Sequence, residues 1–338
     1  MTAISHHLVW QRRDLTGLAA VVFVSLALPF LVPNDYYANV LVLILIYAGL
    51  ASAWNLIGGV AGQFSLGHSA FFGIGAYTST ILYNYVGISP WLGMLAGGII
   101  SVVVSAMIAY PVFRMRGVFF AMATLAVGET IRILLIYSRK FFPLPYSLSI
   151  NYSPGLANMI FEDRATYAVL AGCYFLICAL VTFVMVRSFT GYYLRAIRDN
   201  EDAADASGIS IRRYKLIALL MSAFLTSVGG TLMAQYILYI EPGTVFSIEL
   251  SVDLPLIVIL GGIGTVLGPF IGALILIPLR ETLVEQLGGA LPGSHLVVYG
   301  FLLILIVILL PQGLVGGVER LTGFLKRKRS SQRQAVAS

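Results

Sequence analysis

The sequence predicts an all-α, polytopic helical membrane protein with about ten transmembrane segments. Of its 338 residues, 59% are hydrophobic and 11% are charged, with a mean hydropathy of +0.91. About a quarter of the residues of a soluble domain are charged. The apolar runs extend over about 20 residues, which is the length of a bilayer-spanning helix and not of a barrel strand. Because backbone groups in lipid must pair within the chain, these runs are expected to be helices.

Eight apolar runs are expected to cross the membrane once each. They occupy residues 15–32, 39–57, 66–83, 91–113, 118–137, 166–186, 216–240 and 296–310. The first run could be a signal peptide. It is long, however, and no clear small-residue cleavage site closes it, so a retained span is the preferred interpretation.

Residues 251–280 are expected to cross twice, with a break at Gly261-Gly262-Ile263-Gly264. A single crossing would place the Lys/Arg-rich tail outside, against the preference of basic residues for the cytoplasm. Two crossings place both termini and the polar island 187–215 in the cytoplasm, and the proline-containing loop 139–164 outside. The prediction is therefore ten crossings, with a flexible tail at 331–338.

The positive charge of the chain does not indicate nucleic-acid binding, although the formal net charge is +6. The basic residues cluster at the ends of the apolar runs, where they orient a membrane protein. Cys173 and Cys178 are five residues apart and lie on different faces of a helix. They are interpreted as packing residues. Without a Cys/His cluster, no metal site is predicted.

Two glycine-rich segments of the chain are similar to each other. Leu56-Ile-Gly-Gly-Val-Ala-Gly with Phe72-Gly-Ile-Gly-Ala has a counterpart in Leu260-Gly-Gly-Ile-Gly with Gly268-Pro-Phe-Ile-Gly-Ala. An inverted repeat of two five-helix halves would explain this, because an odd number of crossings inverts the second half. The alternative is two unrelated glycine-rich helix contacts, which are common in membranes.

The polar island carries a predicted helix over residues 192–207, with a modest apolar stripe and Gly208 just past its end. Its acidic residues and flanking arginines suit docking to another protein. The alternative is an ordinary cytoplasmic loop with a surface helix.

Polar residues accompany the glycines at the start of the third run. Gln63, Ser65, His68 and Ser69 provide polar atoms near membrane depth. The glycines allow close helix packing or a broken helix that faces a polar ligand. A lone histidine in this setting is more often a packing residue than a substrate contact or a proton relay.

Glu129 and Arg132 share one apolar run with i,i+3 spacing, so they lie on one helix face. Mutual neutralisation, with Arg132 reaching outward, is one interpretation. A role in the gate or the permeation path is the other, because ionisable residues within spans are often functional.

Four stretches in order resemble LivM-type permeases of branched-chain amino acid importers of the ATP-binding-cassette (ABC) class. They are Gly62-Gln-Phe-Ser-Leu-Gly-His-Ser-Ala-Phe-Phe-Gly-Ile-Gly-Ala-Tyr77, the run from Phe120 to Arg132 with Thr124, Gly128 and Glu129, Leu194-Arg-Ala-Ile-Arg-Asp-Asn-Glu201, and Val258-Ile-Leu-Gly-Gly-Ile-Gly264. Within the island, Asp202-Ala203-Ala204 followed by Gly208 resembles the coupling motif Glu-Ala-Ala-x-x-x-Gly of ABC importer permeases, with Asp in place of Glu. The resemblance covers roughly residues 40–315.

The resemblance implies a single permease domain over residues 1–330, with a coupling loop at 188–213, in a bacterial inner membrane. It would form half of a pore for branched-chain, apolar amino acids. The implied partners are a LivH-like sister permease, two cytoplasmic ATPases that bind the ATP, and a periplasmic substrate-binding protein, and the chain itself would need no cofactor. The implied ATPase-coupling residues are Arg195, Arg198, Asp199, Glu201, Asp202, Ala203, Ala204 and Gly208. The pore or gate candidates are Gln63, Ser65, His68, Ser69, Thr124, Glu129, Gly261, Gly262 and Gly264.

The sequence contains no P-loop and no reactive cluster that would indicate an enzyme. A urea or short-amide permease is the nearest alternative, since such permeases resemble the same family. An ion-coupled secondary transporter, with Glu129 and His68 as a relay, would need more acidic residues within the spans.

Overall fold

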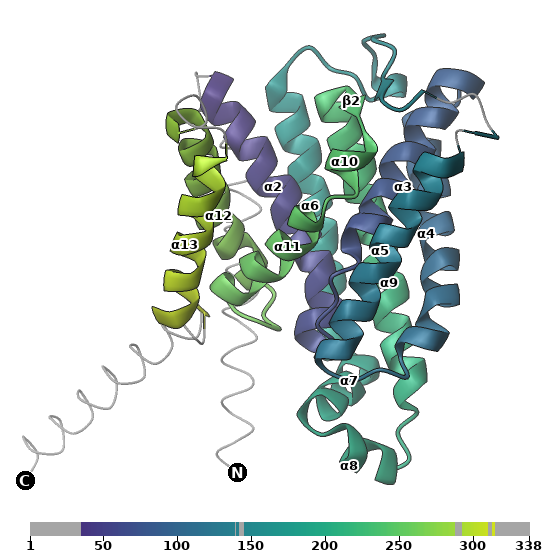
Figure 1. Cartoon of the computed structure of the whole chain (residues 1–338), viewed down its shortest axis with the longest axis vertical. Helices are drawn as coiled ribbons and strands as arrows, with labels where there is room; N and C mark the ends of the chain where they lie inside the picture. The colour runs from purple at the N-terminus through teal and green to yellow at the C-terminus, as the bar shows by residue number, and fades with distance from the viewer. Residues whose placement is uncertain (1–34, 139, 142–144, 288–292, 310–312, 315–338) are drawn as a thin grey trace, which may run out of the picture.

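The computed structural model describes residues 35–138, 140–141, 145–287, 293–309 and 313–314, which form a bundle of helices (Figure 1). The longer helices are α2 (Asp35–Asn55), α4 (Pro90–Val112), α5 (Val118–Ser138), α6 (Arg164–Arg187), α9 (Ile211–Ile237) and α12 (Gly268–Leu287). The shorter ones are α3 (His68–Ile81), α7 (Phe189–Asp199), α8 (Glu201–Ala206), α10 (Pro242–Val245), α11 (Ile248–Gly261) and α13 (Ser294–Leu309). Two π-helical turns, η1 (Leu56–Val60) and η2 (Leu82–Val86), continue α2 and α3, and η3 (Leu156–Asn158) is a 3₁₀ turn.

Helix α2 lies at the centre of the bundle. It packs against α6, α9, α11 and α12, and every side chain from Ile44 to Asn55 is buried. A helix that is apolar on all sides is expected to be buried on all sides. The rest of the bundle is therefore organised around α2.

Helices α3, α4 and α9 form a second closely packed group. A Cβ atom at Gly75 would lie 2.0 Å from the carbonyl oxygen of Ser227, and one at Gly230 would lie 2.1 Å from that of Phe72. Small residues let helix backbones approach in lipid, where close packing drives helix association. Glycine at these two positions therefore sets the distance between α3 and α9.

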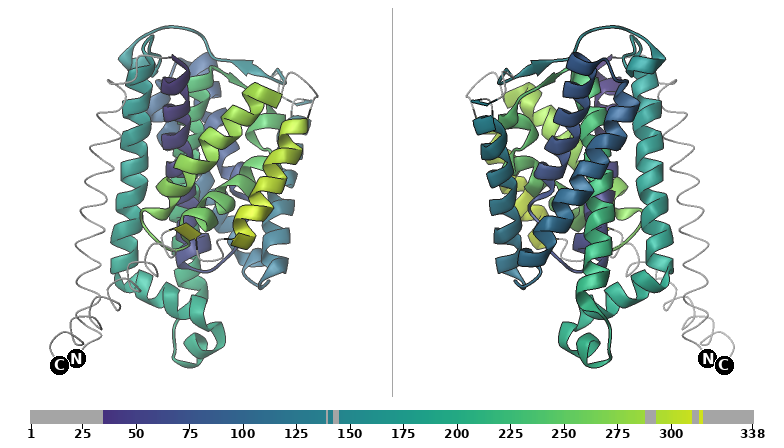
Figure 2. Two further views of the ribbon diagram at one scale, coloured as in Figure 1. Left: turned by 90° about the vertical axis from the view of Figure 1, so that its left-hand side faces the viewer. Right: turned by 90° about the vertical axis from the view of Figure 1, so that its right-hand side faces the viewer.

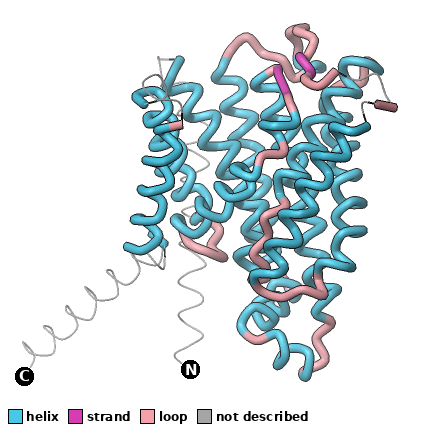
Figure 3. Tube along the Cα trace, in the orientation of Figure 1, coloured by secondary structure: helices cyan, strands magenta, loops and turns pink. Residues whose placement is uncertain are grey.

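The two ends of the bundle differ in structure. Helices α7 and α8 project from one end, as both side views show (Figure 2). At the opposite end, β1 (Leu148–Ser149) pairs with β2 (Tyr239–Ile240), which places the loop after α5 beside the end of α9. Figure 3 shows these strands and loops above the helices. The predicted island and the predicted loop 139–164 thus lie at opposite ends.

Six helical segments in the described part of the chain are long and apolar enough to cross a membrane. They are Asp35–Val60, Pro90–Val112, Val118–Ser138, Arg164–Arg187, Ile211–Ile237 and Pro242–Gly261. The prediction of an all-α membrane protein is confirmed. The predicted first span, residues 15–32, and the tail at 331–338 lie outside the described residues. Ten crossings and an inverted repeat stay predictions.

The predicted glycine break within 251–280 is present. Helix α11 ends at Gly261, and α12 begins at Gly268. Between them, the φ values are +137° at Gly262 and +73° at Gly264. These φ values favour glycine, because other residues carry a Cβ that clashes there. The first glycine-rich segment also breaks the helix, because residues 62–67 are not helical and α3 begins only at His68. The helix of the predicted third span therefore begins two residues after the predicted start at Leu66.

Candidate functional site

The polar island forms two helices, α7 and α8, instead of the single helix predicted over residues 192–207. Asn200 lies between them with an extended backbone, and its Oδ1 accepts a hydrogen bond from the amide of Ala203 at 3.0 Å. Asparagine is a strong N-cap residue, because this bond satisfies an amide that no helical carbonyl can reach. The one-helix prediction was wrong because Asn200 begins a new helix.

Helix α8 is held by four charged residues, Arg116, Glu201, Asp202 and Lys215, which we call the coupling cluster. Lys215 Nζ lies 2.9 Å from Glu201 Oε2, and only 1% of the lysine side chain is exposed. Arg116 Nη1 donates to Asp202 Oδ1 at 2.9 Å, and its Nε lies 3.8 Å from Glu201 Oε1. The bond to Asp202 raises the pKa of Arg116. The turn before α5 and the N-terminal part of α9 therefore fix the position of α8.

Most of the coupling motif is exposed on α8. Asp202, Ala203 and Gly208 are exposed, whereas Ala204 packs inward. Gly208 has a φ of +80°, which a residue with a Cβ rarely adopts. Asp199, at the end of α7, is exposed and pairs with Arg198 at 3.6 Å. These residues form an accessible surface at the extreme end of the molecule (Figure 1).

The two arginines of α7 turn toward the bundle. Arg195 Nη2 donates to a carbonyl oxygen in the last turn of α6 at 2.9 Å. Arg198 Nη1 donates to the carbonyl oxygen of Gly59 at 3.0 Å. A Cβ atom at Gly62 would lie 2.4 Å from Arg198 Cγ, and one at Gly264 would lie 3.1 Å from Arg198 Nη1. Arg198 therefore contacts both of the glycine-rich segments that are similar in sequence.

Those segments meet at a contact that we call the glycine junction, formed by Asn55, Gly59, Gly62, Gly264 and Thr265. Asn55 Oδ1 accepts from the amide of Gly264 at 2.9 Å, and Asn55 Nδ2 donates to the carbonyl oxygen of Thr265 at 2.8 Å. A Cβ atom at Gly59 would lie 2.7 Å from the nitrogen of Gly264. The sequence did not predict that Asn55, within an apolar run, would join the two breaks.

His68 lies fully buried at the first position of α3. Its Nε2 is 2.8 Å from Ser222 Oγ, and that hydroxyl donates to the carbonyl oxygen of Ala53 at 2.7 Å. Because the single hydroxyl hydrogen of Ser222 is already donated, Nε2 carries the hydrogen of the histidine–serine bond. Nδ1 is then an acceptor, and it has no hydrogen-bond partner among the residues described. His68 thus connects α2, α3 and α9.

The other predicted polar candidates fasten the segment around His68. Ser251 Oγ donates to Ser69 Oγ at 2.9 Å and joins α11 to α3. The amide of Leu66 donates to Thr124 Oγ1 at 2.9 Å and joins the non-helical segment to α5.

Ser65 and Gln63 belong to the same non-helical segment. The carbonyl oxygen of Ser65 accepts from Trp54 Nε1 at 2.7 Å, and the backbone amide of half-buried Gln63 donates to Ile57 at 2.9 Å. These contacts support a structural role in the helix break, and a pore role stays a prediction.

Glu129 and Arg132 form an ion pair on α5. Arg132 Nε lies 3.0 Å from Glu129 Oε2, and about a third of each side chain is exposed, 30% and 31%. Mutual neutralisation is confirmed, and a gate role for Glu129 stays a prediction.

Sequence reasoning missed a second charged group, the cavity cluster, formed by Tyr47, Glu249, Asp253, Arg280 and Tyr299. Arg280 Nη1 donates to Asp253 Oδ2 at 2.8 Å and to the Tyr47 hydroxyl at 3.4 Å. Arg280 Nη2 lies 3.4 Å from Glu249 Oε1, and the Tyr299 hydroxyl donates to Asp253 Oδ1 at 3.3 Å. Opposite charges in two neighbouring apolar runs were the available signal, because such residues rarely face lipid unpaired.

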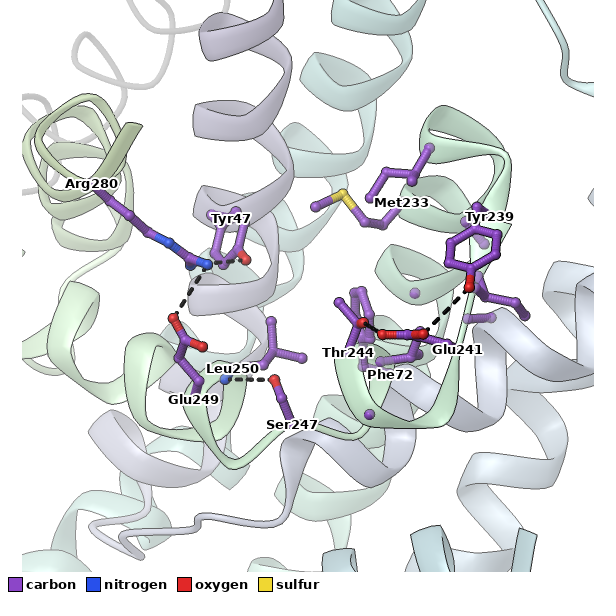
Figure 4. Close-up of a pocket in the computed structure, with 17 residues that line it drawn as sticks. Tyr47, Phe72, Met233, Tyr239, Glu241, Thr244, Ser247, Glu249, Leu250 and Arg280 are labelled. Atoms are coloured by element: carbon purple, nitrogen blue, oxygen red, sulfur yellow. Dashed lines mark hydrogen bonds and ion pairs between the residues drawn. The ribbon is translucent and has the colours of Figure 1, made fainter. Parts of the chain in front are cut away.

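A cavity of about 410 Å³ lies beside Arg280 and Glu249. Its walls are formed by α2, α3, α10, α11, α12 and the C-terminal turns of α9. The cavity therefore lies in the half of the bundle away from α8. Figure 4 shows Arg280, Tyr47 and Glu249 on one side and Glu241, Thr244 and Tyr239 on the other.

Comparison with known proteins identifies the family to which the chain belongs. Residues 36–307 match the family model for the branched-chain amino acid transport system permease component. The chain is 28% identical to the high-affinity branched-chain amino acid transport system permease protein LivM of Escherichia coli. That alignment covers 88% of this chain and 74% of the LivM protein. The chain is 25% identical to the LivH permease protein of Salmonella typhimurium (81% and 92% covered) and 24% identical to the nucleoside ABC transporter permease protein NupC of Lactococcus lactis (57% and 64% covered). No solved structure matches.

The match extends from α2 into α13 and includes the coupling cluster, the glycine junction and the cavity cluster. These relatives are transport permeases and not enzymes. The comparisons favour this family over the urea or short-amide permease and the ion-coupled transporter considered from the sequence. The chain belongs to the branched-chain amino acid ABC transporter permease family and is homologous to LivM and LivH.

Proposed function

We propose that this chain forms half of a pore that imports branched-chain, apolar amino acids, and that separate subunits bind and hydrolyse the ATP. The exposed motif on α8, held by the coupling cluster, is the observation that carries this proposal. The homology of the chain to both LivM and LivH supports a sister permease as the other half of the pore. Two ATPases and a substrate-binding protein complete the proposed assembly.

The α8 surface suits docking to an ATPase. Ala203 and Gly208 are small and exposed, so a partner could approach the backbone closely, while Asp202 offers a charge at the rim. The basic residues around α7 and α8 favour the cytoplasm for this end. The ten-crossing prediction then places both termini in the cytoplasm and the β1–β2 end toward the periplasmic binding protein.

Arg198 offers a path from the docking surface into the bundle. A shift of α7 would move the guanidinium that holds the carbonyl oxygen of Gly59 and lies against Gly264. Because Asn55 joins the two segments, the start of α3 and the α11–α12 turn would respond together. In this proposal, ATPase closure changes access to the pore by moving the glycine junction.

The test is the variant Gly208→Val, compared with Gly87→Val as a matched control. Both glycines have positive φ values, +80° and +73°, and neither has an atom within 4 Å of a built Cβ, so the backbone strain is similar. Gly208 lies just beyond the end of α8, whereas Gly87 follows η2, between α3 and α4. We expect Gly208→Val to lower ATP-dependent leucine uptake by reconstituted transporter at least tenfold, and Gly87→Val to leave it within twofold. Normal uptake by Gly208→Val, or an equal loss in both variants, would contradict the proposal.

A further inference from the structure

We propose that the cavity beside Arg280 and Glu249 is a binding site, within this chain, for one zwitterionic α-amino acid with an apolar side chain. The inference rests on the proposed function and deepens it, because it gives the cargo a location in the permease. The cavity volume of about 410 Å³ falls in the range of small-molecule sites, roughly 300–1,000 Å³.

The charges along one wall fit the head group of an α-amino acid. Its carboxylate and ammonium are attached to the same carbon, so a matching site needs a cation and an anion side by side. Arg280 Nη2 and Glu249 Oε1 lie 3.4 Å apart, and both residues line the cavity. We place the cargo carboxylate on Arg280 and the cargo ammonium on Glu249.

The contacts of Arg280 leave one of its two terminal nitrogens, Nη2, for the cargo. Nη1 is held by buried Asp253 at 2.8 Å, whereas Nη2 has only the looser approach to Glu249 at 3.4 Å. The Asp253 side chain is 4% exposed and the Glu249 side chain is 46% exposed. Asp253 therefore orients the guanidinium from behind, while Glu249 can move to accept an ammonium group.

The pairing of charges also favours a zwitterion. Arg280 is shared by two carboxylates, Asp253 and Glu249, so a cargo carboxylate that takes the place of Glu249 on Arg280 leaves Glu249 to pair with the cargo ammonium. Glu241, on the far wall, is the competing partner. Its two oxygens already accept from the hydroxyls of Thr244 at 2.8 Å and Tyr239 at 3.3 Å. Glu249 is therefore the better ammonium partner. The matched control is Glu285, an exposed residue of α12 that does not line the cavity.

The remaining walls suit an apolar side chain. They include Phe72, Met233, Ile237, Val245 and Leu250. An apolar cavity with a few convergent polar groups is the usual form of a small-molecule site. A bulky residue at Met233 should fill the cavity without touching the ion pair.

Helix α11 connects this site to the glycine junction. Glu249 is in its first turn, Ser251 bonds to Ser69 of α3, and Gly261 is its last residue. Movement of the junction would therefore tilt the helix that carries the ammonium partner. This gives a route by which ATPase closure could release the cargo.

The test measures direct binding of tritiated leucine to the complete transporter in nanodiscs, without the soluble binding protein and without ATP. The variants are Glu249→Gln, Met233→Trp and the control Glu285→Gln. The competitors are unlabelled leucine, leucinamide, which lacks the carboxylate, and 4-methylpentanoate, which lacks the ammonium. Uptake of leucine with ATP and the binding protein is measured on the same preparations.

We expect saturable binding, with both analogues at least tenfold weaker competitors than leucine. Glu249→Gln and Met233→Trp should each weaken binding at least tenfold, while Glu285→Gln should leave binding within twofold. Glu249→Gln should also narrow the preference for leucine over 4-methylpentanoate, which a general loss of structure would not do. Absent binding, or unchanged binding in both site variants, overturns the inference.

The uptake measurement separates the two proposals. Normal ATP-driven uptake without direct binding would leave the proposed function standing and remove the cavity site. Failure of the unmodified transporter to take up any branched-chain amino acid would remove the proposed function, and the cavity site with it.

Discussion

The coupling cluster and the cavity cluster each pair one arginine with two carboxylates, but their surroundings are opposite. In the coupling cluster, the side chains of Arg116 and Asp202 are 62% and 81% exposed. In the cavity cluster, those of Arg280 and Asp253 are 27% and 4% exposed. Exposed ion pairs contribute little to stability, whereas a buried charge that loses its partner is costly. The Arg116–Asp202 pair can therefore open when a partner docks, whereas the Arg280–Asp253 pair holds α11 and α12 together.

The two clusters also differ in charge balance. The coupling cluster has two cations, Arg116 and Lys215, for Glu201 and Asp202, so it is neutral without a ligand. The cavity cluster has a single cation, Arg280, for Asp253 and Glu249. In the coupling cluster each carboxylate therefore has a cation, whereas in the cavity cluster two carboxylates share one arginine, which suits a site where Glu249 exchanges Arg280 for an ammonium group.

The largest effect is expected for Arg280→Met, because it leaves Asp253 buried without its cation. Breaking a buried ion pair by removing one partner costs about 3–5 kcal/mol. We expect a clear fall in the unfolding temperature of the purified transporter. The double variant Arg280→Met with Asp253→Asn should recover part of the loss, and no recovery would show that packing, not charge, causes it.

A smaller loss of stability is expected for Lys215→Met. Lys215 is buried, but its partner Glu201 is partly exposed and keeps Arg116 at 3.8 Å. Leaving such a group without its partner costs about 1–3 kcal/mol. Thermal unfolding in the same detergent measures both variants, and a loss at Lys215 as large as at Arg280 would contradict the comparison.

Arg198→Ala is expected to change coupling more than stability. The Arg198 side chain donates a hydrogen bond to the carbonyl oxygen of Gly59. The control is Arg212→Ala, at an exposed position near the start of α9. We expect about tenfold less leucine transported per ATP hydrolysed, in the range of allosteric coupling effects, with the ATPases still bound. If the ratio stays normal, or falls equally in the control, Arg198 does not transmit the motion.

The smallest effect is expected for Arg116→Ala. The side chain is largely exposed, and salt screens such pairs. We expect no measurable change in unfolding temperature and a modest fall in leucine uptake. High salt should cause a similar fall in uptake by the unmodified transporter, because it screens the same ion pair. A large loss of stability would place Arg116 with the buried residues instead.

Much of the fold could be predicted from local patterns. The length and composition of the apolar runs predicted the helices, the glycine break within 251–280 was placed correctly, and the i,i+3 spacing predicted the Glu129–Arg132 pair. Cys178 is buried, as expected for a packing residue, whereas Cys173, on another face of α6, is exposed and is not packed within this chain. Each of these features depends on residues close together in the chain.

The contacts that were missed join residues far apart in the chain. Arg198 reaches Gly59 across 139 positions, and Asn55 reaches Gly264 across 209. No local periodicity encodes such pairs, because they depend on how helices pack. The split between α7 and α8 is different, since the capping preference of Asn200 was a local signal that the prediction overlooked.

Site-specific cross-linking tests the central claim most directly. In a Cys173→Ser background, Ala203→Cys places a thiol on the exposed side of α8, and Tyr152→Cys places one in the exposed loop at the opposite end. We predict that Ala203→Cys cross-links to an ATPase subunit of the transporter, that ATP changes the yield, and that Tyr152→Cys does not react with that subunit. Absence of the Ala203→Cys product, or equal products from both ends, would contradict coupling through α8.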